Sequence, residues 1–77
     1  MTTEERIIKL LKEVSEKQDV PGREDSLFES GYLDSFALTD MVGALEREFG
    51  IKVPDSDLSP RKFDSIERIE SYVDSSV

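Results

Sequence analysis

The sequence predicts an all-α fold: a small bundle of three main helices plus one short helical turn, with a long loop between the first two helices. Three segments carry apolar residues at the spacing of one helix face, and no segment alternates apolar and polar residues as a half-buried strand does. Between the first two helical segments, glycine, proline and short polar residues interrupt this spacing over residues 18–34. A chain of 77 residues has room for one small core, so we expect a single domain over residues 1–77.

The first helix is predicted over residues 3–18. Its apolar residues follow the i, i+3, i+4, i+7 pattern and gather on one face: Ile7, Leu10, Leu11 and Val14. Thr2 and Glu5 have the spacing of a capping box, in which each side chain bonds the other residue's backbone N–H. We therefore expect a defined helix start and one buried face.

The connection over residues 18–34 is long for so small a domain, and loops of this length are usually functional or disordered. Large apolar side chains in it argue against disorder, because they gain free energy by packing on a core. These side chains are Leu27, Phe28, Tyr32 and Leu33. We expect a loop that is anchored to the helices.

The second helix is predicted from about Ser35 to Phe49, and Gly50 is typical of the residue that ends a helix. One face of this helix is apolar and is expected to enter the core; it carries Leu38, Met41, Val42, Leu45 and Phe49.

The opposite face of the second helix is unusual, because it combines an aromatic residue with small ones: Phe36, Asp40, Gly43, Ala44 and Arg47. A glycine inside a helix costs about 1 kcal/mol relative to alanine. Small residues beside an exposed aromatic suit close docking of another protein, so we predict a partner-binding face here. In the alternative interpretation, Phe36 folds over the preceding loop and Gly43 has no role.

The remainder of the chain is predicted to cross the bundle in extended form after Gly50 and then to form the short helical turn within residues 58–63, with Pro60 near its start. The last helix follows Asp64 or Ser65 as its N-cap. Its inward residues are Ile66, Ile69 and Val73, with Tyr72 at the edge of the core.

The composition excludes several classes of function. With 10 Lys plus Arg and 18 Asp plus Glu, the formal net charge is −8, which disfavours nucleic acid and anionic membranes as partners. Without His or Cys, the chain cannot build the usual zinc sites, a Ser-His-Asp triad or a disulfide. We expect no enzymatic activity, no membrane insertion, a monomer and, since no signal-peptide pattern is present, a cytoplasmic location.

The candidate site is Asp34-Ser35, where the long loop meets the second helix. Serine is a preferred N-cap residue, so the simplest interpretation is that Ser35 only satisfies backbone N–H groups at the helix start. The alternative is that its hydroxyl is a functional group. The head of a helix offers free N–H groups and a partial positive charge, which favour a bound anion.

The sequence around this site resembles the attachment region of acyl and peptidyl carrier proteins. The resemblance rests on the string Leu27-Phe28-Glu29-Ser30-Gly31-Tyr32-Leu33-Asp34-Ser35-Phe36 and on the helix exit Phe49-Gly50-Ile51 followed by Val53-Pro54. It extends over nearly the whole chain. Phe36 stands where the family commonly has leucine, and Arg47 departs from the uniformly acidic helix of fatty-acid carriers.

The resemblance implies that a phosphopantetheinyl transferase attaches 4′-phosphopantetheine from coenzyme A to the Ser35 hydroxyl. It also implies that Asp34 helps to hold Mg²⁺ during modification only, since hard cations bind carboxylate and phosphate oxygens together. The thiol of the arm then carries an acyl or aminoacyl group as a thioester. A carrier of this kind is a substrate of the transferase and is not itself an enzyme.

The partners implied by the resemblance are the transferase, an acyl- or aminoacyl-loading enzyme, and downstream synthases or transferases. The string Gly31-Tyr32-Leu33-Asp34-Ser35 looks somewhat closer to stand-alone aminoacyl carriers, such as the D-alanyl carrier of teichoic acid modification, and to carriers of specialised biosynthetic clusters. Two alternatives stay open: a D-alanyl carrier within the family, and an unmodified acidic helical protein-interaction module outside it.

Overall fold

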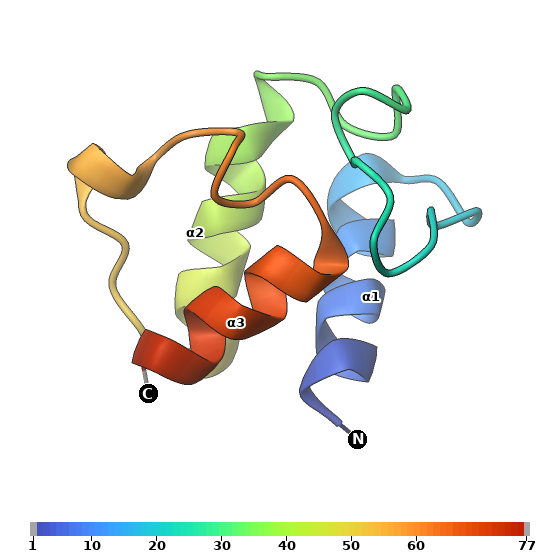
Figure 1. Cartoon of the computed structure of the whole chain (residues 1–77). Coiled ribbons are helices and arrows are strands. Elements are labelled where there is room, and N and C mark those ends of the chain that lie inside the picture. The colour runs from blue at the N-terminus through green and yellow to red at the C-terminus, as the bar shows by residue number, and fades with distance from the viewer. Residues whose placement is uncertain (1, 77) are drawn as a thin grey trace.

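The computed structural model describes residues 2–76 and confirms the all-α fold (Figure 1). Its elements, in chain order, are α1 (Thr3–Ser15), α2 (Ala37–Phe49), the 3₁₀ turn η1 (Asp55–Asp57) and α3 (Ile66–Ser76). Within the described part of the chain none of these helices is long and apolar enough to cross a membrane.

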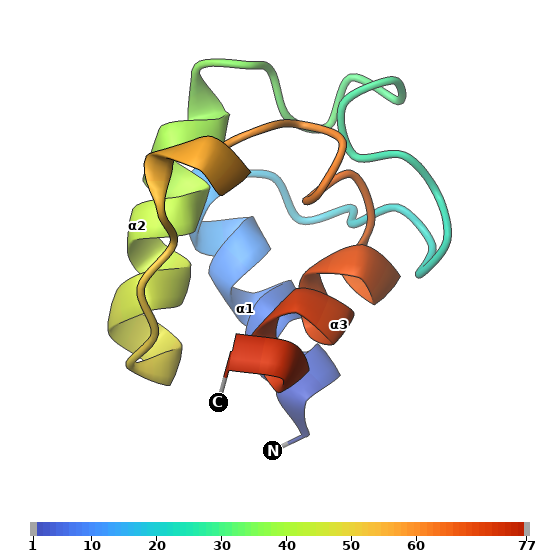
Figure 2. The same ribbon diagram turned by 60° about the vertical axis from the view of Figure 1, so that its left-hand side comes forward.

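The central element of the bundle is α1, which packs against both α2 and α3. In Figure 2, α1 lies between the other two helices, and the segment that carries η1 passes beside α2 on its way to α3. The long first loop covers the end of the bundle at which α2 begins (Figure 1). This end carries the candidate site.

The core is formed by one face of each helix and by apolar residues of both long connections. The predicted inward residues are buried in all three helices, except that Val14 and Phe49 are only half-buried. Leu27 and Phe63, which belong to the connections, are completely buried. The connections therefore close the core where three short helices alone would leave it open to water.

The predicted start of α1 is confirmed, and its predicted end is three residues too far along the chain. Thr2 and Glu5 form the capping box, with both hydrogen bonds present. Glu16 adopts a left-handed conformation with φ 60°, and its N–H donates to the carbonyl of Lys12. The helix therefore stops at Ser15, and Lys17 turns toward the first loop instead of continuing the helix.

The predicted position of the short helical turn is wrong. The turn lies at Asp55–Asp57, whereas residues 58–63 form hydrogen-bonded turns without a helix. Pro54, whose backbone is extended, starts η1, and its carbonyl accepts from the N–H of Asp57. The Asp57 carboxylate then accepts from the Tyr72 hydroxyl of α3 at 2.8 Å, a tertiary contact that local sequence does not reveal.

The predicted start of α3 is confirmed. The Ser65 hydroxyl accepts from the N–H of Arg68 at 3.2 Å, which satisfies one of the first-turn donors of the helix. Ile66, Ile69 and Val73 are buried and Tyr72 lies at the edge of the core, as their spacing predicts.

Candidate functional site

Ser35 lies in the turn that precedes α2, and its side chain is exposed. The helix begins at Ala37, and its N-cap residue, Phe36, makes no side-chain capping bond. Among residues 2–76, no recorded hydrogen bond uses the Ser35 hydroxyl. The predicted helix start at about Ser35 is thus two residues early, and the interpretation of Ser35 as a simple cap is wrong.

The capping role belongs to Asp34. Its carboxylate Oδ1 accepts from the backbone N–H of Ala37 at 2.9 Å, and its backbone carbonyl accepts from the same N–H at 3.1 Å. Because this carboxylate already satisfies the N–H of Ala37, the neighbouring hydroxyl is not needed for the fold. Ser35 is left with an accessible oxygen beside the N-terminus of a helix.

The loop that carries Ser35 is fixed on both sides. Leu27 and Leu33 are buried, and the N–H of Leu33 donates to the carbonyl of Leu27 at 2.9 Å. The Ser26 hydroxyl donates to the Asp64 carboxylate at 2.6 Å, which ties the loop to the segment before α3. These contacts hold the two residues before Ser35 in a defined position relative to the core.

A lysine side chain also anchors this loop, through a contact that the sequence did not reveal. The Lys17 ammonium donates to the carbonyls of Gly31, at 3.0 Å, and of Tyr32, at 3.3 Å. Gly31 has φ 83°, a left-handed conformation that suits glycine and turns its carbonyl within reach of this ammonium. The interaction joins residues fourteen positions apart, so no helical or turn spacing signals it.

The residues around Ser35 fit a phosphate group on its hydroxyl. A hollow of about 220 Å³ beside it is lined by Lys17, Asp34 and Ala37, among others. The first turn of α2 has backbone N–H groups without an intrahelical partner and the positive end of the helix dipole, both of which favour an anion. Lys17 adds a full positive charge. The Asp34 carboxylate repels an anion unless a metal cation lies between them.

The described residues hold no group of three or more metal-ligating side chains. Asp34 is the acidic residue next to Ser35, and one of its carboxylate oxygens is already bonded to the N–H of Ala37. Any Mg²⁺ that binds here during modification must therefore take most of its ligands from a partner enzyme, its substrate and water.

The predicted partner-binding residues do not share one outward face. Phe36 is 86% exposed, which contradicts the interpretation that it folds over the preceding loop. Asp40 and Arg47 are exposed as well, but Gly43 and Ala44 are half-buried. Four of the five line a hollow between α2 and α1: Asp40, Gly43, Ala44 and Arg47.

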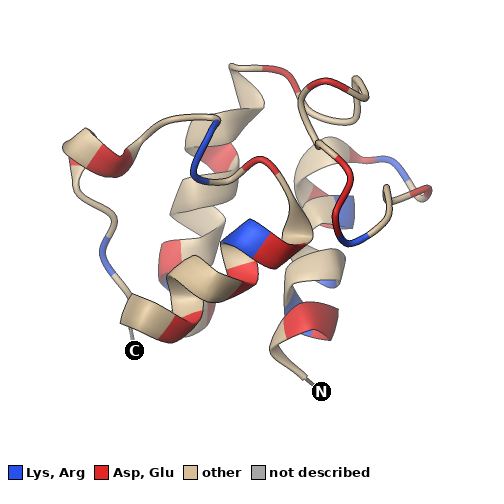
Figure 3. Cartoon of the chain, in the orientation of Figure 1, with Lys and Arg blue, Asp and Glu red and all other residues tan. Residues whose placement is uncertain are grey.

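The charge of α2 is partly used inside the molecule. From Asp34 to Glu48 there are four acidic residues and Arg47, a sum of −4 + 1 = −3. Glu48 forms an ion pair with Arg6 of α1 at 2.7 Å, and the Glu46 carboxylate accepts from the N–H of Val53 at 2.8 Å. Acidic residues extend from the first loop onto α2 (Figure 3), and in the sequence Asp34 and Asp40 are the ones closest to Ser35.

Comparison with known proteins identifies similar sequences. The profile of the family described as "Phosphopantetheine attachment site" matches residues 5–73. The D-alanyl carrier protein of Enterococcus faecalis is 34% identical over 58 residues, which is 74% of each chain. That of Streptococcus pyogenes serotype M5 is 32% identical over 79 residues, covering 96% of this chain and 94% of its own. That of Streptococcus uberis is 30% identical over 69 residues, covering 90% and 87%.

Proposed function

The chain belongs to the family of phosphopantetheine attachment domains and is a carrier protein, and we propose that Ser35 is the residue that bears its arm. The observation that carries this proposal is the accessible Ser35 hydroxyl at the head of α2, which the fold does not use. A carrier presents its cargo to enzymes, so its interactions are with the enzymes that modify and load it.

The modification is a phosphoryl transfer from coenzyme A to Ser35. The hydroxyl oxygen forms a bond to the phosphorus that bears pantetheine, the bond of that phosphorus to the bridging pyrophosphate oxygen breaks, and adenosine 3′,5′-bisphosphate leaves. We assign the proton of the Ser35 hydroxyl to a base of the transferase, because the chain contains no His and the adjacent Asp34 carboxylate caps α2 and is proposed to bind Mg²⁺. Once attached, the arm supplies a thiol that holds the cargo as a thioester.

Asp34 is proposed to help bind Mg²⁺ during this transfer. It is adjacent to Ser35, and its exposed carboxylate keeps one oxygen that no described residue bonds. A magnesium ion shared by this carboxylate and the coenzyme A phosphates would neutralise the repulsion between them. The fold provides the position, and the transferase and its substrate provide the remaining ligands.

The cargo is proposed to be a small aminoacyl group, and D-alanine is the first candidate. The relatives named above are D-alanyl carrier proteins. The hollows nearest Ser35 combine apolar side chains such as Val14 with charged ones such as Lys17 and Arg47, so neither offers a long alkyl chain a continuous apolar lining. A short, charged cargo suits such a surface better than a fatty acyl group. Other acyl cargoes are the alternative within this family.

Phe36, just before α2, and Asp40 of α2 are proposed as the residues that successive partner enzymes contact first, with Gly43, Ala44 and Arg47 farther along the helix. An 86% exposed phenylalanine next to Ser35 is a suitable apolar anchor for a partner. The acidic surface favours rapid, salt-sensitive encounters with basic enzyme surfaces. In this proposal the protein acts as a monomer in the cytoplasm, where coenzyme A and the transferase are found.

Intact-mass measurement tests the proposed function. The purified chain is incubated with coenzyme A, Mg²⁺ and a promiscuous phosphopantetheinyl transferase. We expect one added phosphopantetheine in the wild type and none in Ser35→Ala. Ser71→Ala is the matched control, because Ser71 is also exposed and no hydrogen bond to its hydroxyl is found among the described residues. Absence of the added mass from the folded wild-type chain would instead favour the unmodified interaction module.

Loading assays then test the cargo. The modified protein is offered to a panel of amino-acid adenylating enzymes and acyltransferases, and the mass of each thioester is recorded. Loading by a D-alanine adenylating enzyme, with little transfer by fatty acyltransferases, is the expected result. The reverse pattern would remove the aminoacyl proposal and leave the attachment at Ser35 intact.

A further inference from the structure

A lysine just after α1 holds the part of the first loop that lies nearest Ser35. The Lys17 ammonium donates to the carbonyls of Gly31 and Tyr32, and in return the Tyr32 hydroxyl donates to the Lys17 carbonyl at 3.3 Å. The ammonium also lies 5.9 Å from the centroid of the Tyr32 ring, within the range of a cation–π contact. We call these contacts the Lys17–Tyr32 clasp. Its bonds from the ammonium are of the stronger kind, because their donor is charged.

The Lys17–Tyr32 clasp is the polar link between this part of the loop and the end of α1. Between Ser26 and Leu33, the other recorded hydrogen bonds to the rest of the described fold join Ser26 and Leu27 to Asp64. Those two residues lie nine and eight positions before Ser35, whereas the two loop residues of the clasp lie four and three positions before it. The clasp therefore fixes the loop backbone closest to the candidate site.

A strained backbone at the end of α1 turns Lys17 toward the loop. Glu16 has φ 60° and is the one non-glycine residue with a positive φ in the described part of the chain. This conformation is unfavourable for a residue with a side chain, and helices more commonly use glycine there, as α2 does at Gly50. Strain of this kind persists where the surrounding structure fixes it, and it is concentrated at functional sites. The contacts of the clasp follow directly after this bend.

The position of the Ser35 hydroxyl depends on the backbone that carries it, because no recorded hydrogen bond within residues 2–76 holds its side chain. After Ser35, the chain is held by α2 and by the bond from the N–H of Ala37 to Asp34. Before Ser35, it is held by the buried Leu33 and by the Lys17–Tyr32 clasp. Loss of the clasp would loosen the loop side alone and leave the three packed helices in place.

We propose that Lys17 is a positioning residue for the modification of Ser35: through the clasp it holds the Ser35 hydroxyl where it can attack the phosphorus of coenzyme A in line. The proposal rests on the attachment at Ser35. Lys17 takes no part in the bonds that form and break. Catalysis of phosphoryl transfer depends strongly on positioning, and a misplacement of about 1 Å can lower the rate about 100-fold. A loop that is held three residues before the nucleophile reduces such misplacement.

Lys17 also lines the hollow beside Ser35, so its charge could instead attract the phosphates of coenzyme A directly. The two roles differ in the kinetic constant that they change. A positioning role changes the rate of the chemical step, whereas direct attraction changes the KM for coenzyme A. The ammonium has three N–H donors, and bonds to two loop carbonyls at 3.0 and 3.3 Å orient it toward the backbone, which favours positioning.

Single-turnover kinetics of the modification, with the phosphopantetheinyl transferase and coenzyme A in excess, tests the inference. Lys17→Met keeps the length of the side chain and removes the ammonium. We expect its rate constant at saturation to fall by about tenfold or more. The half-saturating transferase concentration should change by less than about twofold, because Phe36 and Asp40, the proposed first contacts, are unaltered. Lys17→Arg restores a charged donor and should recover most of the rate.

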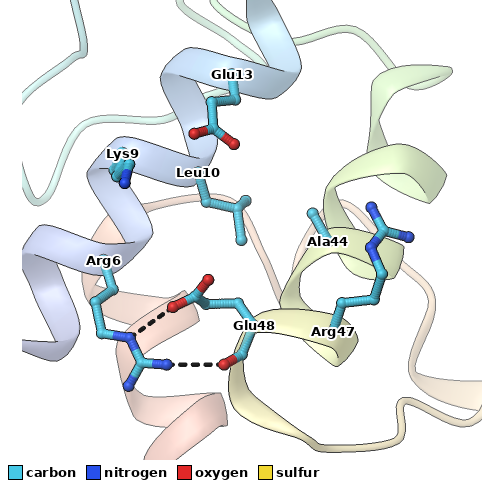
Figure 4. A pocket seen from close by; sticks show the side chains of 7 residues that line it. All are labelled: Arg6, Lys9, Leu10, Glu13, Ala44, Arg47 and Glu48. Carbon is cyan, nitrogen blue, oxygen red and sulfur yellow. Dashed lines mark hydrogen bonds and ion pairs between the residues drawn. The ribbon is translucent and has the colours of Figure 1, made fainter.

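Two control variants separate positioning from changes in charge and in stability. Lys9→Met makes the same substitution on α1, where Lys9 borders a hollow of about 280 Å³ between α1 and α2. Figure 4 shows no interaction between Lys9 and the other side chains that line this hollow, and no ion pair of Lys9 is recorded in the described part of the chain. Thr2→Ala removes the cap of α1 and lowers stability far from the loop. Both controls should be modified at the wild-type rate.

The outcomes separate this inference from the proposed function. A wild-type chain that accepts no phosphopantetheine would overturn both. Normal modification of the wild type, with the same saturating rate constant in Lys17→Met as in the two controls, would overturn the positioning role alone, and so would a change in KM at an unchanged rate constant. If Lys17→Met does not fold, Tyr32→Phe replaces it, because it removes the returning hydrogen bond and keeps the buried ring. An unchanged rate in Tyr32→Phe would then overturn the proposal, and a fall of about twofold or more would support it.

Discussion

The starts of α1 and α2 both carry a hydroxyl residue, but the two hydroxyls have opposite roles. At α1, the Thr2 hydroxyl accepts from the N–H of Glu5 at 3.1 Å, and the Glu5 carboxylate accepts from the N–H of Thr2 at 3.1 Å. At α2, the Ser35 hydroxyl is exposed and enters no recorded hydrogen bond within residues 2–76. One hydroxyl is part of the fold, and the other is available for chemistry.

The difference comes from the backbone. Thr2 is extended, with φ −78° and ψ 165°, which lets its side chain turn back onto the helix N–H groups. Phe36, the residue just before α2, already has helical angles of φ −74° and ψ −32°. The chain therefore turns earlier at α2, and the capping acceptor is Asp34. A serine near a helix start is a cap only where the backbone places it as one.

The sharpest test of this comparison replaces each of the two hydroxyl residues by alanine. Ser35→Ala should abolish the modification and change the free energy of unfolding by less than about 0.5 kcal/mol. Thr2→Ala should leave the modification complete and lower the free energy of unfolding by about 1 kcal/mol. Intact mass and thermal unfolding measure the two effects. Equal destabilisation by both substitutions would refute the contrast.

Substitution of Asp34 separates its capping role from its proposed metal role. Asp34→Ala removes the acceptor for the N–H of Ala37 and should cost about 1 kcal/mol, or about 4–8 °C in Tm. Asp34→Asn keeps a capping oxygen and should retain most of the stability, but should slow modification by about tenfold or more at limiting Mg²⁺. If Asp34→Asn is modified at the wild-type rate with the same Mg²⁺ dependence, Asp34 is only a cap.

The Gly43→Ala substitution probes α2 away from its start. It should raise the free energy of unfolding by up to about 1 kcal/mol, because alanine favours the helix and its Cβ meets only the Arg47 side chain. Chemical denaturation with an unchanged m-value measures the gain. A loss of stability would mean that packing around Gly43 requires glycine there.

The smallest expected effect is a loss of stability at acid pH, to which Glu5 of α1 and Asp57 of η1 contribute. Hydrogen bonds from Thr2 lower the pKa of Glu5, and the Lys62 ammonium and the Tyr72 hydroxyl lower the pKa of Asp57. The folded state binds protons at these two carboxylates less readily than the unfolded state does. Both carboxylates therefore add to the free energy of unfolding at pH values above the ordinary carboxyl pKa. These contributions are lost as the pH falls through the lower, folded values.

Melting temperatures recorded between about pH 5 and pH 3 should therefore fall, and the fall should be smaller in Asp57→Asn than in the wild type. Glu24→Gln is the control, because the exposed Glu24 side chain forms no recorded ion pair in the described part of the chain. An identical fall in the wild type and both variants would exclude a contribution from Asp57.

Most of the helical architecture follows from the sequence. The apolar spacing in α1, α2 and α3 predicts the buried faces correctly. Each helix has a single apolar face, and only that face can pack on the core without burying charged side chains. Local signals also identify the Thr2 cap, the Gly50 exit and the Ser65 cap, since each depends on residues within four positions of one another. Leu27 and Leu33 correctly indicate an anchored loop.

Tertiary structure decided the features that join distant parts of the chain. Lys17 binds the loop carbonyls, Asp57 bonds Tyr72, and α1 approaches α2 closely enough for Gly43 and Ala44 to line a hollow between the two helices. No spacing rule reports these contacts, because they depend on how three helices are placed relative to one another. The sequence by itself determined which hydroxyl to consider, and the folded backbone decided that Ser35 is left accessible while Asp34 caps α2.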